Sequence, residues 1–180
     1  MMRAVRLAAL AVLVGAAGCG GGGQRLSTSA LPAAPALLHL SSPAFVNGAR
    51  LAPQYTCDGA GEEPEVRVGT VPAGARELVA VVTDPDAPGG TFVHLTRYGI
   101  PPRATSVSTG GLEGRTSTGG DGWTPPCPPK GDKAHHYIWS VYVLREPTGL
   151  AAGASPPAVT GALAAHGVLA RGTLTALYGR

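Results

Sequence analysis

Apolar and β-branched residues gather in short runs along the chain, and segments rich in Pro, Gly or polar residues separate these runs. The runs at 77–83, 92–98 and 137–144 have the length and composition of β-strands, and the first is apolar enough to be covered on both faces. Alternation also predicts a terminal strand at 171–176. In 137–144, one face carries Tyr137, Trp139, Val141 and Val143, and the other carries Ile138, Ser140, Tyr142 and Leu144.

Breaks between the runs predict loops, and one segment predicts a helix. Pro85–Gly90, Pro101–Pro102 and Pro125–Gly131 contain prolines, which cannot donate to a central ladder, so these segments are loops or strand ends. Ala158–Ala165 follows two prolines and precedes Gly167, the asymmetry typical of helix ends. We therefore predict a mainly β fold, a two-sheet β-sandwich with one short C-terminal helix.

Residues 1–18 have the layout of a secretory signal peptide. Arg3 and Arg6 precede an apolar run, Leu7–Ala17, and small residues follow. This run is about half of the roughly 20 residues that a membrane-spanning helix needs. The pattern therefore predicts a cleaved signal and an exported protein.

Cys19 follows the small residues directly, in an arrangement that resembles a bacterial lipobox. In this interpretation it receives a diacylglyceryl group and a further acyl chain such as palmitate, and it anchors a lipoprotein to a membrane of the cell envelope. The alternative is an ordinary secretory signal with an incidental cysteine. Residues 19–35 are mostly Gly, Ser, Ala and Pro and predict a flexible tether, which leaves 36–180 as one domain.

Loss of the signal peptide changes the charge of the chain. Residues 1–18 contain two arginines and no acid, so the formal charge falls from +3 to +1, that is, 3 minus 2. The remaining sequence has no stripe of Lys and Arg. Nucleic acid is therefore not an expected partner.

Cys57 and Cys127 form an even pair once Cys19 is lipidated, in a compartment that permits disulfides. We predict a disulfide between them, which requires their Cα atoms to lie within about 7 Å. The bridge would close a loop of about 70 residues and stabilise the fold by roughly 4 kcal/mol in the chain-entropy model.

Side chains that could carry chemistry lie at strand ends or in the adjoining loops. Asp84 directly follows a buried run and opens a loop stiffened by two prolines, where a plain Asx turn is the structural alternative. His94 lies between apolar neighbours in a strand, where a satisfied core histidine is the alternative. His135 and Tyr137 are two residues apart, so they share one face of their strand, and His136 lies on the opposite face. An imidazole and a phenol side by side can both donate to an anion.

Several short motifs follow one another along the chain: Ser42-Pro43-Ala44-Phe45, Tyr55-Thr56-Cys57-Asp58-Gly59, Val71-Pro72-Ala73-Gly74, Asp84-Pro85-Asp86-Ala87-Pro88, Tyr98-Gly99-Ile100-Pro101, Gly131, His135-x-Tyr137 and His166-Gly167-Val168-Leu169-Ala170 with Tyr178. Their order resembles that of bacterial phosphatidylethanolamine-binding proteins, also called Raf kinase inhibitor-like proteins. The resemblance covers about Leu38–Arg180. The Asp-Pro-Asp-Ala-Pro and His-x-Tyr elements are specific as a set.

The resemblance implies a β-sandwich with a small surface pocket that accepts phosphate, acetate or a phosphorylated group such as a phospholipid head group. The family's pocket Asp falls on Asp84, and its strand His falls on His94. Its second His and its Tyr fall on His135 and Tyr137, and Pro88 would form part of the wall. The imidazoles and the phenol would donate to anion oxygens, and Asp84 would orient an imidazole and favour its protonated form.

Four departures from the family pattern predict a changed pocket rim. Many bacterial members have Trp-x-His-Trp where this chain has Phe92-Val93-His94-Leu95, and Gly-Gly-Pro-Cys-Pro-Pro where it has Thr124-Pro125-Pro126-Cys127-Pro128-Pro129. His136 replaces a common Arg, and Val68 replaces a frequent Trp. The rim therefore loses indole area.

These observations favour a membrane-anchored binding protein, without cofactor or metal, that modulates a protein partner the sequence does not identify. No Ser or Cys nucleophile with a base in reach is visible, so we do not expect an enzyme. A zinc-dependent hydrolase that uses Asp84, His94 and His135 is the alternative, because these are zinc ligand types. A structural or adhesive role is a third. Kinase inhibition belongs to eukaryotic relatives and is not carried over to an exported protein.

Overall fold

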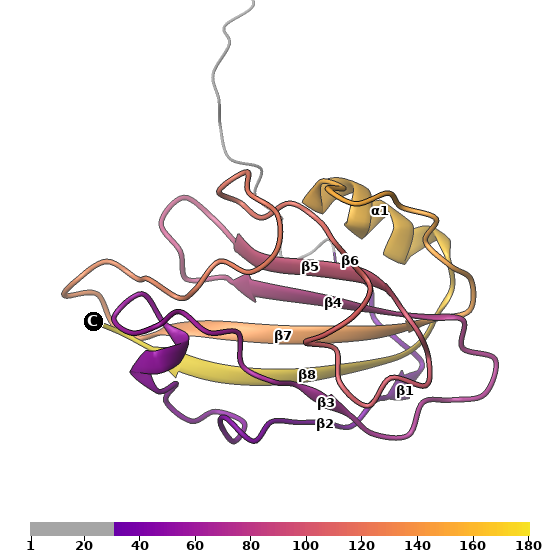
Figure 1. Cartoon of the computed structure of the whole chain (residues 1–180), viewed down its shortest axis with the longest axis horizontal. Helices are drawn as coiled ribbons and strands as arrows, with labels where there is room; N and C mark the ends of the chain where they lie inside the picture. Colours follow the sequence, from indigo (N-terminus) through magenta and orange to yellow (C-terminus); the bar gives the residue numbers. More distant parts are fainter. Residues whose placement is uncertain (1–30) are drawn as a thin grey trace, which may run out of the picture.

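The structure, a computed structural model, describes residues 31–180 (Figure 1). The predicted signal peptide, the predicted lipidation site Cys19 and most of the predicted tether lie outside the described residues. The described part contains one α-helix, α1 (Pro156–Ala165), and a short 3-10 helix, η2 (Pro53–Tyr55). Its strands are β1 (Ala36–Leu37), β2 (Leu40–Ser41), β3 (Arg67–Val68), β4 (Glu77–Asp84), β5 (Phe92–Ile100), β6 (Leu112–Glu113), β7 (His135–Leu144) and β8 (Val168–Tyr178).

The main sheet has six strands in the order β1-β8-β7-β4-β5-β6. All neighbours are antiparallel except β1 and β8, which are parallel. The long strands β4, β5, β7 and β8 are the four that the sequence predicted, each with one or more additional residues at its ends. β4 lies in the interior of the sheet, and all of its residues are buried, as its apolar composition predicts.

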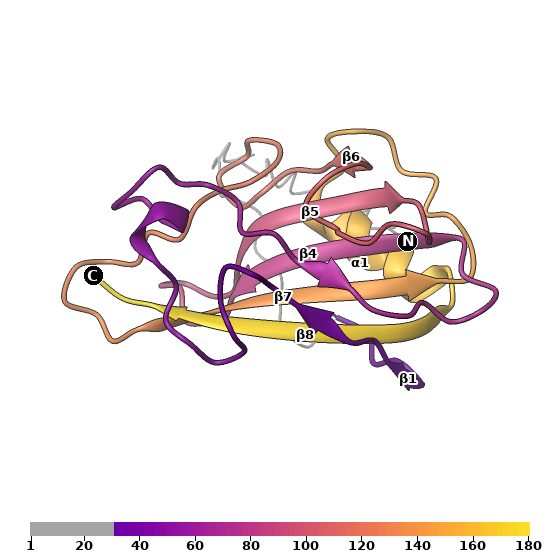
Figure 2. The same cartoon turned by 60° about the horizontal axis from the view of Figure 1, so that its bottom comes forward.

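Alternation along β7 divides the interior into two cores. Tyr137, Trp139 and Val141 belong to the larger core, together with N-terminal residues such as Phe45. The opposite face of β7 belongs to the smaller core, where helix residues such as Val159 pack. The N-terminal segments with β2 and β3 therefore cover one face of the main sheet, and α1 covers the other (Figures 1 and 2).

The predicted fold class is confirmed, with a second sheet that is very small. β2 and β3 contain two residues each and pair with one another, and an isolated bridge also joins Arg67 of β3 to Ser106. The rest of this layer is irregular chain, because prolines interrupt it at short intervals and cannot donate to a ladder.

The helix begins at Pro156 rather than at the predicted Ala158. Ser155 caps it by accepting a hydrogen bond from the Ala158 amide, and Pro156 occupies the first turn, where no intrahelical donor is needed. Gly167 follows with φ of 67°, as the predicted C-terminal signal requires. No helix within residues 31–180 is long and apolar enough to span a membrane.

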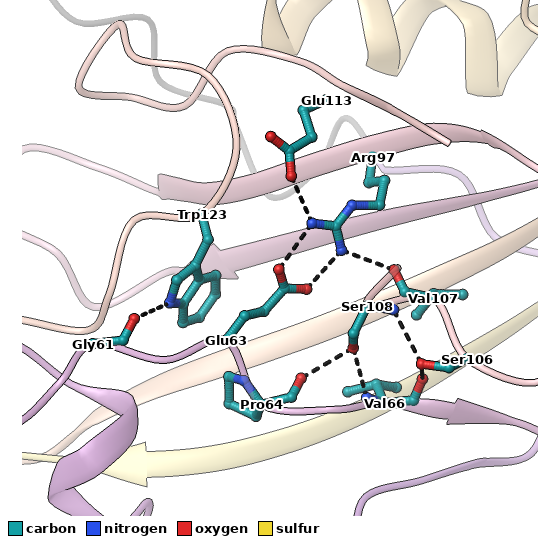
Figure 3. Close-up of polar contacts among 10 residues, drawn as sticks. All are labelled: Gly61, Glu63, Pro64, Val66, Arg97, Ser106, Val107, Ser108, Glu113 and Trp123. Carbon is teal, nitrogen blue, oxygen red and sulfur yellow. Dashed lines mark hydrogen bonds and ion pairs between the residues drawn. The ribbon is translucent and has the colours of Figure 1, made fainter. Parts of the chain in front are cut away.

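An ion-pair network centred on the buried Arg97 fastens the irregular layer to β5 (Figure 3). The Arg97 side chain is 5 % exposed and contacts both carboxyl oxygens of Glu63, at 2.7 and 2.8 Å, and Glu113 at 2.7 Å. In the same view, the Trp123 indole donates to the Gly61 carbonyl at 3.0 Å. These contacts hold the chain around Gly61 and Glu63 against the main sheet.

Candidate functional site

A pocket of about 390 Å³ opens at one end of three adjacent strands, within the usual size range of ligand pockets. Because β4 is antiparallel to both β5 and β7, its last residue lies beside their first residues. Asp84, Pro88, His94, His135 and Tyr137 all line this pocket. The fold therefore brings together every pocket residue that the sequence and the family resemblance singled out.

Asp84 and His135 form a buried pair. His135 Nδ1 lies 2.7 Å from Asp84 Oδ2, and each residue is 3 % exposed. An ionised carboxylate only accepts, so the imidazole donates through Nδ1. The other oxygen, Asp84 Oδ1, accepts from the Asp86 amide at 2.8 Å. Asp84 thus makes the local turn contact of the structural alternative and also orients an imidazole.

His136 lies on the opposite face of β7, as strand alternation predicted. It is exposed, and Asp86 Oδ2 accepts from its backbone amide at 2.9 Å and lies 2.7 Å from its Nδ1. Burial acts to raise the pKa of Asp86, but the two hydrogen bonds and the charge of His136 outweigh it, so the net pKa is lowered. Neither residue lines the pocket. His136 is therefore a natural reference for the pocket histidines.

His94 reaches the pocket through a β-bulge. Two successive residues of β4 pair with Leu95 and Val93, so His94 between them has no opposing residue. A bulge of this kind redirects side chains relative to strict alternation. Leu95 consequently faces the larger core and Val93 the smaller one. The His94 ring lies beside Tyr137, with ring centroids 5.2 Å apart.

Thr124 fixes the orientation of the His94 ring. The Thr124 amide donates to the His94 carbonyl at 2.8 Å, and the Thr124 carbonyl lies 2.7 Å from His94 Nδ1. A carbonyl only accepts, so Nδ1 carries the hydrogen. His94 is therefore held through its backbone and its side chain by the same residue.

Burial lowers the pKa of His94 to about 4, against smaller opposing effects from the Thr124 hydrogen bond and the charge of Asp84. The ring is 4 % exposed and neutral near pH 7. We expected Asp84 to favour a protonated imidazole in the site. The charge of Asp84 does favour the protonated form of His94, but the cost of burying a charge exceeds this attraction, so the ring stays neutral.

Two buried polar atoms beside the pocket, His94 Nε2 and the Tyr137 hydroxyl, have no hydrogen-bond partner among residues 31–180. Burial raises the pKa of Tyr137, and the charges of Asp84 and Asp86 raise it further, so the phenol stays protonated. Buried polar groups are nearly always paired, and an unpaired one costs about 1–3 kcal/mol. Such atoms beside a cavity are available to a ligand.

The segment Pro125–Pro129 forms one wall of the pocket and carries Cys127. Cys127 is bonded to Cys57, with Cα atoms 5.3 Å apart, so the predicted disulfide is confirmed. The Cys57 amide also donates to the Pro126 carbonyl at 3.0 Å. The wall is therefore held covalently and by hydrogen bonding.

Several residues of the site were not predicted in these roles. No sequence signal pointed to the clamp made by Thr124. Phe92 also lines the pocket. Asp58, within a motif that the sequence did single out, accepts from the Tyr178 hydroxyl at 2.6 Å and from Arg180 Nε at 3.1 Å. It ties the end of the chain to the loop that carries the disulfide.

The charges around the pocket are few. Among the described residues that line it, Asp84 is the one carboxyl group, and none is Lys or Arg. Within the same part of the chain, no group of three or more His, Cys, Asp or Glu residues is arranged to hold a metal ion. The zinc-hydrolase alternative gains no support from this geometry.

Comparisons with known proteins agree on a family. The family model "Phosphatidylethanolamine-binding protein" matches residues 41–179. The Mycobacterium tuberculosis (strain H37Rv) protein named "Putative lipoprotein LppC" is 38% identical over 179 residues, which cover 89% of this chain and 86% of that protein.

Two solved structures are similar in fold. The phosphatidylethanolamine-binding protein homologue CT736 of Chlamydia trachomatis has a TM-score of 0.74 and 28% identity, covering 80% of this chain and 98% of its own. YbcL of Escherichia coli, described as a new member of the mammalian PEBP family, has a TM-score of 0.74 and 29% identity, covering 81% and 99%. With these matches and its sheet, helix and pocket, the chain belongs to the phosphatidylethanolamine-binding protein family.

Proposed function

We propose that this chain is an exported lipoprotein whose pocket binds a small anionic group, such as phosphate or a phospholipid head group. The observation that carries the proposal is the pair of buried atoms without a described partner, His94 Nε2 and the Tyr137 hydroxyl, beside a pocket of about 390 Å³. A ligand that bonds to both would remove the cost of leaving them unpaired. The family name, phosphatidylethanolamine-binding protein, also points to a ligand that contains a phosphoryl group.

The chemistry of the lining favours binding over catalysis. The cysteine in the pocket wall, Cys127, is held in a disulfide and cannot act as a thiolate. Two threonine hydroxyls at the pocket, those of Thr118 and Thr124, are hydrogen-bonded to Thr116 at 2.7 and 3.1 Å rather than to an imidazole. Among the described lining residues, neither threonine hydroxyl is therefore paired with a base that would activate it. Ligand occupancy would then act on a protein partner rather than on the ligand itself.

Attachment to the membrane through Cys19 rests on the apolar run and small residues before it, and on the lipoprotein name of a relative. We expect Cys19→Ser to abolish lipidation. Expressed in a bacterium that processes lipoproteins, the wild type should partition into detergent and carry the mass of its acyl chains, and the variant should do neither. A variant that partitions with the acylated mass would contradict the anchor.

The pocket proposal is tested by titration calorimetry with phosphate and phosphorylethanolamine. His94→Ala and His135→Ala should each weaken binding by at least about tenfold, which corresponds to about 1.4 kcal/mol. His136→Ala is the matched control, because this histidine lies on the same strand but faces away from the pocket. It should leave affinity within about twofold. Unchanged affinity in both pocket variants would place the ligand elsewhere.

A further inference from the structure

The two available atoms of the pocket differ in hydrogen-bonding character. His94 Nδ1 must carry a hydrogen, because its partner is the Thr124 carbonyl at 2.7 Å. In the neutral ring, Nε2 is then a bare acceptor. The Tyr137 phenol keeps its proton and can donate. The pocket therefore presents an acceptor and a donor on two rings whose centroids are 5.2 Å apart.

The groups around His94 oppose a second negative charge. From β4 it meets the charge of Asp84, and from β7 it meets His135 and Tyr137. Phe92 on its own strand and Trp123 in the neighbouring loop add only aromatic rings. At the pocket, His135 is already paired with Asp84.

Farther out on the same side, the Asp132 carboxyl lies 3.8 Å from His135 Nε2. No Lys or Arg occurs among the described lining residues, and Arg180, whose Nη1 lies 3.3 Å from Cys127 Sγ in the wall, is already paired with Asp58 through Nε. An unprotonated oxyanion would also place an acceptor oxygen against an acceptor nitrogen at His94, so both charge and hydrogen bonding disfavour it.

We infer that the pocket selects an oxyacid group that carries its own proton, namely the singly protonated form of a phosphate monoester. Its P–OH would donate to His94 Nε2, and another of its oxygens would accept from the Tyr137 hydroxyl. This inference rests on the proposed anion-binding function and narrows its ligand class. A phosphate diester, the linkage inside a phosphatidylethanolamine head group, has no such proton and would be bound weakly.

Methyl phosphate and methyl sulfate test the inference, because the two monoanions have the same shape and charge and only the phosphate carries a proton. Calorimetry on the full lipidated protein in detergent should give methyl phosphate at least about tenfold tighter binding at pH 6. The ratio of the two affinities should fall by about 50-fold as pH rises to 8, because the second pKa of a phosphate monoester is about 6 and the singly protonated form becomes rare. Taking the ratio cancels titration of the protein's own groups.

His94→Gln provides the matched variant. Its amide can donate as well as accept, so the preference for methyl phosphate at pH 6 should shrink to within about threefold. Dimethyl phosphate should bind the wild type at least about tenfold more weakly than methyl phosphate. Dihexanoyl phosphatidic acid separates two sources of a monoester: tighter binding than methyl phosphate supports a lipid monoester, and equal or weaker binding supports a soluble one.

The outcomes separate the inference from the function on which it rests. Equal affinity for methyl phosphate and methyl sulfate at pH 6 would overturn the proton requirement and leave anion binding intact. Absence of binding by phosphate, both methyl esters and phosphatidic acid would overturn the proposed function itself, and the inference with it.

Discussion

β4 carries a buried carboxyl group at each end, and the two ends are built for different purposes. Glu77 at the first end is 4 % exposed and accepts three hydrogen bonds, from the Gly99 amide and from the amide and hydroxyl of Thr148, each at 2.8 Å. Asp84 at the last end is 3 % exposed and shares its oxygens between the Asp86 amide and the His135 imidazole.

The difference lies in what the partners can do. Backbone amides only donate, so the two amide contacts of Glu77 always require an acceptor, and they serve the fold. An imidazole can exchange donor and acceptor roles between its two nitrogens, so the contact of Asp84 can adapt. Atoms without a described partner, His94 Nε2 and the Tyr137 hydroxyl, lie beside the pocket at that end. Glu77, a fully hydrogen-bonded carboxyl group, therefore stabilises the fold. Asp84, whose imidazole partner can change its hydrogen-bonding role and which lies near unpaired atoms, is suited to a binding site.

The largest expected effect concerns the covalent tie at the pocket end. The double substitution Cys57→Ser and Cys127→Ser removes a link across a sequence separation of 70 residues. It should lower the free energy of unfolding by about 4 kcal/mol, measured by urea denaturation. It should also weaken phosphate binding, because Cys127 lies in the pocket wall. A loss of stability below about 1 kcal/mol would show that the disulfide does not restrain the unfolded chain.

Glu77→Gln should have the next largest effect, about 3 kcal/mol of lost stability in urea denaturation. The substituted amide presents an oxygen to one set of donors and an NH₂ group to the other. At least one of the amides of Gly99 and Thr148 then faces a donor and remains buried without a partner, which costs about 1–3 kcal/mol in addition to the weakened charged bonds. Phosphate affinity should be unchanged, because Glu77 is at the far end of β4.

Asp84→Asn is the matched control at the other end. It should cost less than about 1 kcal/mol, because His135 can change tautomer and accept where it formerly donated. It should instead reduce phosphate affinity, more weakly than His94→Ala or His135→Ala does. Equal stability losses in the Glu77 and Asp84 variants would contradict the distinction between the two ends.

Lowering the pH from 7.5 to 5 should reduce the free energy of unfolding by about 2 kcal/mol, because His94 beside the pocket resists protonation in the folded protein. The pKa of His94 is about 4 in the folded protein and 6.5 in its ordinary state. Between those values the unfolded chain binds a proton that the folded chain does not. The stability from the neutral ring is therefore present above pH 6.5 and is lost as pH falls toward 4. Urea denaturation in phosphate-free buffers at both pH values measures the change.

His94→Asn should remove this acid sensitivity, since Asn can still donate to the Thr124 carbonyl and does not titrate. The exposed His136→Asn is its control and should retain the full loss. An acid response that is the same in all three proteins would assign the pH dependence to other groups.

The sequence predicted most of the fold but only part of the site. Local periodicity determines the former, and contacts between residues distant in sequence determine much of the latter. Period-2 alternation placed His135 and Tyr137 on one face because β7 is a regular strand. The direction of His94 depends on a bulge, which arises from pairing with β4 and leaves no local pattern. Thr124 holds His94 across 30 residues, and Thr148 meets Glu77 across 71. Contacts this distant are set by tertiary packing, which neither period nor composition encodes.

Two fully buried tyrosines lie near opposite ends of β4, and the substitution with the smallest expected effect on stability is found by comparing them. The Tyr98 hydroxyl, near the Glu77 end, donates to the Ala151 carbonyl at 2.6 Å and accepts from the Ala154 amide at 3.1 Å. Tyr98→Phe removes both of these hydrogen bonds and should cost about 1 to 2 kcal/mol. Tyr137→Phe removes a hydroxyl that has no described partner, so the free energy of unfolding should stay within about 0.5 kcal/mol of wild type or rise.

For ligand affinity the order should reverse. Tyr137→Phe should bind methyl phosphate about tenfold more weakly because the donor to the ligand is gone, and Tyr98→Phe should bind it as tightly as the wild type does. Urea denaturation and calorimetry on the same two proteins decide between the interpretations. If Tyr137→Phe were as destabilising as Tyr98→Phe and bound methyl phosphate normally, the hydroxyl would be a structural group, and the two ends of β4 would not differ in purpose.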